Sequence, residues 1–245
     1  MFSISLRAGI AVAATTLLLG CAHSPPGDPQ DPFESVNRGI YKFNDTADRY
    51  AVRPLAKGYR KVTPDPVEKS IGNFFTNIRY PITIVNDILQ LKPGQTVNDI
   101  GRFLINTTFG VAGLFDVASY WGVPRNDEDF GQTLGYWGLG QGAYLVLPFL
   151  GPSTGRDAIG QVADGFTNPM SYIQDEAVRY SLYALYFIDL RASLLGLDQA
   201  VYESFDPYIF VRDAYLSDRL DKVYDGDVPP EKIEVQYDDD FYDTE

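Results

Sequence analysis

This chain of 245 residues has little of the chemistry on which many enzymes depend. It contains one histidine, His23, one cysteine, Cys21, and two methionines. Zinc sites are typically built from clusters of cysteine and histidine, and this composition offers no such cluster for a zinc site. Asp127, Asp129 and Gly131 form only a fragment of a calcium-binding loop. We therefore expect no metal and no cofactor.

Positive charge is also scarce. The chain has 20 lysine and arginine residues against 33 aspartate and glutamate residues, a formal net charge of −13. Nucleic-acid binding requires a positive surface, and so does adhesion to anionic lipid through a basic patch, so both are disfavoured. Any contact with a membrane must be mostly hydrophobic. Residues 225–245 carry nine acids and one lysine and are expected to form a disordered acidic tail.

The stretch Gly151-Pro152-Ser153-Thr154-Gly155 matches G-x-S-x-G, the nucleophile motif of lipases and esterases. A serine triad needs a histidine to take the serine proton, and His23 lies near the N-terminus. A Ser-x-x-Lys scheme needs lysine at position 156, where an arginine stands that cannot act as a base. Thr154 and Asp157 instead have the spacing of a capping box. We expect a turn and a helix cap here, and no enzyme.

The N-terminal residues predict export and lipidation. Residues 1–20 place one arginine before an apolar stretch and small residues, as in a secretory signal peptide. Leu18-Leu19-Gly20-Cys21 resembles the lipobox of bacterial lipoproteins, in which cleavage between Gly20 and Cys21 leaves a cysteine that carries a diacylglycerol and an N-acyl chain. Three acyl chains make a permanent anchor. The alternative is an ordinary signal peptide followed by a free thiol. Ala22 favours sorting to the outer membrane, on its periplasmic face.

Residues 21–31 are the lipidated cysteine and a proline-rich linker, and 32–224 read as one mainly α domain with at most a short β-hairpin. Helix starts are predicted at Asp31-Pro32, Thr63-Pro64, Pro81, Asn168-Pro169 and Asp206-Pro207, and residues 95–109 also have a helical pattern. Pro54 is expected to end or kink the first helix. Ile173, Ala177, Tyr180, Ala184 and Phe187 form one apolar stripe. Only residues 143–150 have the character of a strand.

Residues 102–123 are apolar and glycine-rich, with little amphipathic contrast. Such a segment belongs either in the core or in a hairpin that dips into one leaflet. Trp121 and Trp137 each lie in a Tyr-Trp-Gly triplet, which suits a membrane interface or an ordinary turn. The glycines from 131 to 142 do not match a phosphate-binding loop and suit tight turns.

Several stretches together resemble the MlaA (VacJ) family of lipoproteins, and the resemblance covers about residues 31–220. They are DPFESVNRGIYKFN at 31–44, RP at 53–54, NFFTN at 73–77, RFLINTTFGVAGLFDVAS at 102–119, DFGQTLGYWGLGQGAYLVLPFLGPSTGRD at 129–157 and DPYIFVRDAY at 206–215. The fourth of these holds both Arg102 and Asp116, which can pair if the chain bends at Gly110 or Gly113.

The resemblance implies a helical, ring-shaped domain in the inner leaflet of the outer membrane, whose central channel takes mislocalised phospholipid from the outer leaflet. It also implies transfer to a soluble periplasmic carrier and association with a trimeric porin. The candidate channel residues are Asn106, Thr107, Thr108, Gly135, Gly138, Gly140 and Gly142. Alternatively these residues merely shape the fold. A scaffold lipoprotein that binds envelope partners and moves no lipid is the second hypothesis.

Overall fold

The computed structural model describes residues 30–232, and within them the chain is mainly helical. The order is α2 (Glu34–Ala47), the π-helix η1 (Asp48–Val52), α3 (Arg53–Val62), α4 (Asp65–Leu89), α5 (Pro93–Thr108), α6 (Val117–Tyr120), α7 (Phe130–Tyr136), β1 (Tyr144–Leu147), β2 (Gly151–Thr154), α8 (Gly155–Thr167), η2 (Pro169–Tyr172), α9 (Glu176–Ser193), η3 (Leu194–Leu197), α10 (Asp198–Glu203) and α11 (Pro207–Val223). The predicted mainly α class with one hairpin is confirmed.

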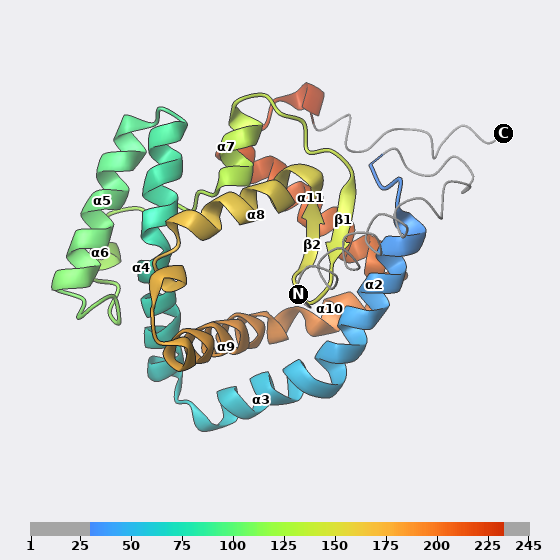
Figure 1. Ribbon diagram of the computed structural model, residues 1–245, viewed down its shortest axis with the longest axis horizontal. Coiled ribbons are helices and arrows are strands. Elements are labelled where there is room, and N and C mark those ends of the chain that lie inside the picture. The colour runs from blue at the N-terminus through green and yellow to red at the C-terminus, as the bar shows by residue number, and fades with distance from the viewer. Residues whose placement is uncertain (1–29, 233–245) are drawn as a thin grey trace, which may run out of the picture.

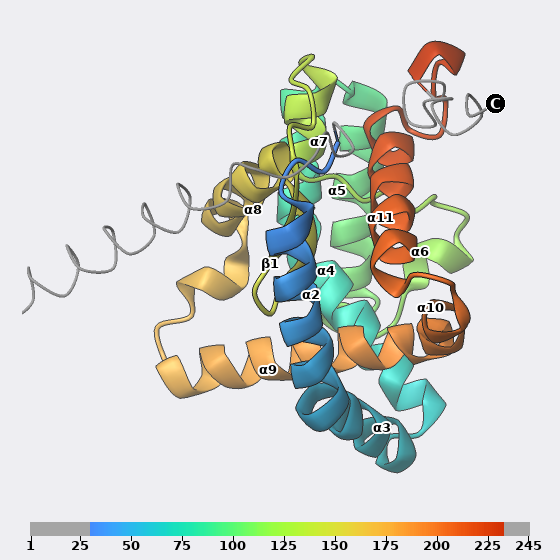
Figure 2. The ribbon, with the colours of Figure 1, turned by 90° about the vertical axis from the view of Figure 1, so that its right-hand side faces the viewer.

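The elements follow a ring. In Figure 1, α2, α3, α4, α8 and the β1–β2 hairpin succeed one another around an open centre, and α5 with α6 lies on the outer side of α4. α9 packs on α3 and α4, and α11 packs on α7 and β2. Seen at right angles in Figure 2, α9 projects to one side of the ring. This arrangement holds distant parts of the sequence in one curved wall.

The first curve of the ring passes Pro54 without a break. α2, η1 and α3 run on directly from Glu34 to Val62. The wider π turn of η1 comes just before Pro54, the second residue of α3. A proline lacks an N–H and its ring crowds the preceding turn, and a local π turn makes room for it. The expected end or kink is therefore a π segment inside a continuous helical run.

The prediction that a helix begins at Pro81 is wrong. Pro81 lies inside α4, which runs unbroken from Asp65 to Leu89. A proline in a helix interior removes one backbone hydrogen bond and costs about 3 kcal/mol. Its neighbours Tyr80 and Ile82 are both buried, so tertiary packing on both sides of the proline maintains the helix.

The hairpin is held by two asparagines of α2. β1 pairs antiparallel with β2, with Tyr144 opposite Thr154. The Asn37 amide donates to the Tyr144 carbonyl at 2.9 Å and accepts from the Val146 N–H at 2.9 Å. Asn44, two turns later, makes the same pair of bonds to the Leu147 carbonyl and the Phe149 N–H. These amides satisfy the outer edge of β1, where an open strand would otherwise expose its backbone.

The α-helix predicted to begin at Asn168-Pro169 begins later, and the predicted apolar stripe lies mostly on its exposed face. α9 begins at Glu176, with Asp175 as its cap, and Pro169–Tyr172 form a separate 3₁₀ turn. Tyr180 is 62 % exposed and Phe187 is 40 % exposed. The periodicity therefore marks an apolar helix face that does not point into the protein.

Candidate functional site

The described part of the chain is inverted in polarity. Its buried residues include more polar and charged side chains than hydrophobic ones, among them Asp87, Asp99, Arg102 and Arg219. Its exposed large hydrophobic side chains greatly outnumber the buried ones. Water-soluble proteins rarely expose contiguous apolar patches of such extent. This surface suits a lipid environment or an extensive apolar partner.

The exposed apolar residues follow helical stripes. On α5 they are Val97, Ile100 and Leu104. On α8 they are Ile159, Val162 and Phe166, and these three side chains are 60–72 % exposed. Both sets have spacings of three and four, which places each on one helix face. Between residues 30 and 232, no helix is long and apolar enough to cross a membrane. Apolar stripes without a spanning helix are typical of helices that lie in the plane of a lipid surface.

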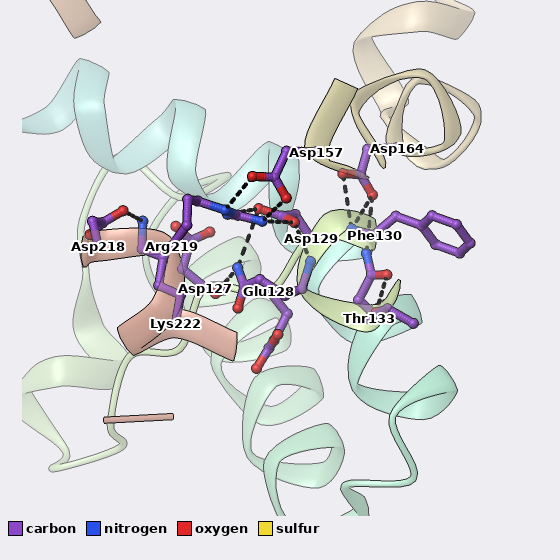
Figure 3. A network of polar contacts seen from close by, with 12 residues as sticks. Asp127, Glu128, Asp129, Phe130, Thr133, Asp157, Asp164, Asp218, Arg219 and Lys222 are labelled. Atoms are coloured by element: carbon purple, nitrogen blue, oxygen red, sulfur yellow. Dashed lines mark hydrogen bonds and ion pairs between the residues drawn. The ribbon is translucent and has the colours of Figure 1, made fainter. Parts of the chain in front are cut away.

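One polar cluster joins α7, α8 and α11 (Figure 3). The Arg219 guanidinium donates to both carboxylate oxygens of Asp129, at 2.6 and 2.9 Å, and to both of Asp157, at 3.0 Å each. Asp129 also caps α7, through the Gln132 N–H. Burial opposes ionisation of Asp129, but Arg219 and Gln132 outweigh it and lower the pKa of the carboxyl. Asp129 therefore stays ionised, and its ion pair with Arg219 connects α7 to α11.

A second cluster confirms the predicted pairing of Arg102 with Asp116. The Arg102 Nη2 lies 2.7 Å from Asp116 Oδ1, and its Nε donates to the Tyr80 hydroxyl at 2.7 Å. The chain reverses between the two residues through a left-handed turn in which Val111, Ala112 and Gly113 all have positive φ. A β-branched residue in that conformation is strained, so the ion pair and its neighbours must hold the turn.

Two buried carboxyl groups face each other between α4 and α5. Asp87 and Asp99 are fully buried, and the Asn126 amide donates to both, at 3.2 and 3.1 Å. Burial and the adjacent Asp99 raise the pKa of Asp87 to about 8, so the pair shares a proton at neutral pH. Sequence reasoning missed this pair. Its signal was the tetrapeptide Val-Asn-Asp-Ile, which occurs at 85–88 and again at 97–100, on either side of the turn.

A cleft of about 750 Å³ lies between α4, the loop that follows α6, and α9. Its lining mixes cations, carboxylates, hydroxyls and apolar groups: Arg60, Asp65, Glu68, Lys69, Gly72, Asn73, Phe75, Thr76, Arg79, Tyr80, Ile82, Thr83, Arg125, Asn126, Asp127, Glu128, Tyr186, Asp189, Leu190 and Ser193. A smaller cleft of about 460 Å³ shares Arg125 and Asp127 with it. Sequence reasoning missed the larger cleft, because its walls come from three separate segments.

The predicted polar channel residues lie together at the end of α5. Asn106 is buried, where its amide donates to Asp116 at 3.0 Å and accepts from the Ala118 N–H at 2.9 Å. Thr107 accepts from Asn77 at 2.9 Å, and Thr108 donates back to the Leu104 carbonyl. Neither cleft described above includes these three residues. Their contacts support the turn between α5 and α6.

The four predicted glycines lie elsewhere, in α7 and the loop after it. A Cβ on Gly135 would approach Arg156 Nη1 and Val223 to 2.8 Å, so this glycine allows close helix packing. Gly138 and Gly142 have φ values of +90° and +70°, which favour glycine, and Gly140 lies in open space. The structure does not bring these glycines together with Asn106, Thr107 and Thr108.

Ser153 is fully buried at the end of β2, and its hydroxyl donates to the Thr154 carbonyl at 3.3 Å. The Thr154 side chain accepts from the Asp157 N–H at 3.1 Å, so the predicted cap of α8 is confirmed. His23, Gly20 and Cys21 lie outside the described residues, where signal cleavage and lipidation stay predictions. In the described residues no group of acids or histidines has the arrangement of a metal site.

Together these features define, within residues 30–232, a mainly helical domain with many exposed apolar side chains and a largely polar interior. Residues 29–222 match the family model described as MlaA lipoprotein. The chain therefore belongs to the MlaA lipoprotein family, a family of transport lipoproteins, and the resemblance found in its sequence is confirmed.

Curated relatives agree along most of their length. The chain is 38 % identical over 229 residues to the intermembrane phospholipid transport system lipoprotein MlaA of Escherichia coli, covering 91 % of this chain and 90 % of that protein. The Haemophilus influenzae protein of the same name is 32 % identical, covering 88 % and 90 %. A solved structure described as "Structural basis for maintenance of bacterial outer membrane lipid asymmetry" superposes with a TM-score of 0.69 at 36 % identity, covering 77 % of this chain and 96 % of its own.

Proposed function

We propose that this chain is a lipid-anchored protein of the outer membrane that removes mislocalised phospholipid from the outer leaflet. Family membership supports a role in phospholipid transport, because the Escherichia coli and Haemophilus influenzae relatives are named for intermembrane phospholipid transport. The observation that carries the proposal is the inverted polarity, with apolar stripes on α5 and α8 outside and ionised or hydrogen-bonded groups inside. A phospholipid needs this combination, because its headgroup must pass polar groups while its chains stay in an apolar phase.

In this proposal Gly20 and Cys21 are the cleavage site, and the acylated Cys21 holds the body at the periplasmic face. The domain of residues 32–224 lies in the inner leaflet, and the acidic tail of residues 225–245 follows it in the sequence. Because the anchor is permanent and the linker of 21–31 is short, a soluble periplasmic carrier must take the lipid away. A trimeric porin is the proposed neighbour in the membrane.

The proposed activity is translocation and breaks no covalent bond. Ser153 supports this part, because its hydroxyl is buried and bonded to the backbone. Asn106, Thr107, Thr108 and the glycines at 135, 138, 140 and 142 remain candidates for the channel or its mouth. Their contacts equally suit residues that shape its wall.

The test is the amount of phospholipid on the surface of cells that lack this protein, with complementation by wild type or by Ser153→Ala at equal abundance. The proposal predicts that deletion raises surface phospholipid and that both versions restore it. If only wild type restores it, the serine takes part in chemistry and the chain is a hydrolase. If deletion changes nothing, transport is contradicted and the scaffold hypothesis takes its place.

A further inference from the structure

Two arginines in the larger cleft differ from the other arginines of the described chain. Every other arginine in residues 30–232 forms an ion pair with an aspartate or glutamate, whereas Arg79 and Arg125 form none. The chain has a large excess of acids, so carboxylate partners are not scarce. Both arginines nevertheless line the same cleft. Two guanidinium groups without a direct ion pair at one cavity wall favour an anionic ligand.

The two guanidinium groups attach to one turn of α4. The Arg125 Nη2 reaches Thr76 Oγ1 at 3.4 Å, and Arg79 stands three residues after Thr76 on the same helix face. The Arg79 Nη1 donates to the Tyr186 hydroxyl on α9, and its guanidinium lies 5.3 Å from the centre of that ring. As each hydroxyl accepts from an arginine, its own hydrogen points elsewhere and can donate to a ligand. Arginine and hydroxyl donors of this kind match phosphate oxygens.

Three of the acids that line the cleft have partners other than Arg79 and Arg125. Glu68 pairs with Arg60, Glu128 pairs with Lys92, and Asp189 accepts from Tyr59 at 2.8 Å. Asp65 lies 14 residues before Arg79 on α4, about 20 Å away along the helix axis. Asp127 lies two residues after Arg125 in the sequence. Within the described residues it forms no ion pair. Asp189 forms no ion pair within these residues either, and Asp164 attracts Arg79 from outside the lining, so Arg79 and Arg125 are distinguished by the lack of a direct ion pair and not by a net positive charge.

An apolar wall adjoins the arginines. Phe75, Ile82 and Leu190 line the same cleft, and Leu190 is 43 % exposed. A volume of about 750 Å³ is in the range of ligand pockets. A cavity with phosphate-type donors beside apolar side chains fits an amphipathic phosphate ester better than a bare anion. We propose that Arg79 and Arg125 bind the headgroup phosphate of a phospholipid in this cleft, an inference that rests on the proposed function.

Binding by the full acylated chain in a neutral, phosphate-free detergent tests this proposal. The probes are dihexanoyl phosphatidylglycerol, dihexanoylglycerol, which lacks the phosphate, and inorganic phosphate. Wild type is expected to bind the phosphatidylglycerol most tightly. Arg79→Gln and Arg125→Gln are each expected to weaken that binding about tenfold, because each removes a charged hydrogen bond. Neither is expected to change binding of dihexanoylglycerol.

Arg60→Gln is the matched control, since it removes the same charge from the same cleft at a residue that already has a carboxylate partner, Glu68. It is expected to bind like wild type. The proposal is overturned if Arg79→Gln and Arg125→Gln bind like the control, or if dihexanoylglycerol binds as tightly as the phospholipid. It is also overturned if inorganic phosphate alone binds as tightly, which would indicate a free-anion site.

The same variants in cells separate this inference from the proposed function. If deletion of the chain raises surface phospholipid and the Arg79→Gln, Arg125→Gln double variant restores it fully, the arginine assignment fails while transport stands. If deletion has no effect, transport itself fails, whatever the binding results. The inference predicts that the double variant leaves surface phospholipid raised and that Arg60→Gln lowers it as wild type does.

Discussion

Arg219 and Arg102 are both buried, yet they secure the chain in different ways. Arg219, on α11, bonds to Asp129 and Asp157, which lie 90 and 62 residues away in sequence. Arg102, on α5, finds Asp116 only 14 residues away and otherwise bonds to neutral groups, including Tyr80 and Ser119. The first cluster joins α7, α8 and α11, which are distant in sequence, whereas the second shapes one local turn. A buried charge can therefore stabilise either contacts between elements that are distant in sequence or a single local turn.

The largest expected effect is at Arg219. Arg219→Met leaves Asp129 without its cation and Asp157 with Arg156 alone, and we expect the free energy of unfolding to fall by about 3–5 kcal/mol. Urea unfolding in detergent micelles measures it. Asp218→Asn, on the exposed side of the same helix, is the control and is expected to change little. A loss below about 1 kcal/mol for Arg219→Met would show that the Arg219 cluster is not needed to hold α7, α8 and α11 together.

Arg102→Met is expected to act locally. Asp116 is 24 % exposed, so water partly replaces the lost cation, and we expect a loss of about 2 kcal/mol. Hydrogen exchange is expected to speed up in residues 109–123 and to stay unchanged in α7, α8 and α11. Faster exchange throughout the ring would contradict the distinction between the two arginines.

The Asp87–Asp99 pair is buried and, within residues 30–232, forms no direct ion pair with a lysine or arginine. The pKa of Asp87 rises from 3.8 to about 8, so its protonated form favours the folded state. That contribution is complete below pH 4 and is lost as pH rises through 8. We expect the stability of wild type to fall between pH 5 and pH 8. Asp87→Asn is expected to reduce this fall by at least about 1 kcal/mol, and an unchanged pH profile would contradict the shared proton.

The smallest effect is expected at Ser153, near the end of β2. Its hydroxyl makes one long bond to the Thr154 carbonyl, so Ser153→Ala is expected to cost no more than about 1 kcal/mol. Thr154→Ala removes the cap of α8 and is expected to cost about 1–2 kcal/mol. Thermal unfolding of both variants measures the order. A larger loss at Ser153 than at Thr154 would reverse our assignment of the cap.

Local signals in the sequence predicted local features well. The caps at Thr154 and Asp206 and the hairpin followed from residue types and spacing. The start at Pro81 failed because packing around Tyr80 and Ile82 overrides the proline. The α9 periodicity identified an apolar helix face, but periodicity does not say whether that face is buried or exposed. The cleft arginines were beyond prediction, because what distinguishes them within residues 30–232 is the lack of a carboxylate partner, which depends on the folded structure.

The most direct test of the account is whether the exposed apolar surface contacts lipid. The chain has two tryptophans, Trp121 and Trp137, which are 58 % and 54 % exposed. Trp137→Phe leaves Trp121, beside the exposed Phe109, as the single reporter. In vesicles of phospholipids with brominated acyl chains, the account predicts short-wavelength emission and strong quenching of Trp121. Emission typical of tryptophan in water, unchanged by bromination, would contradict it.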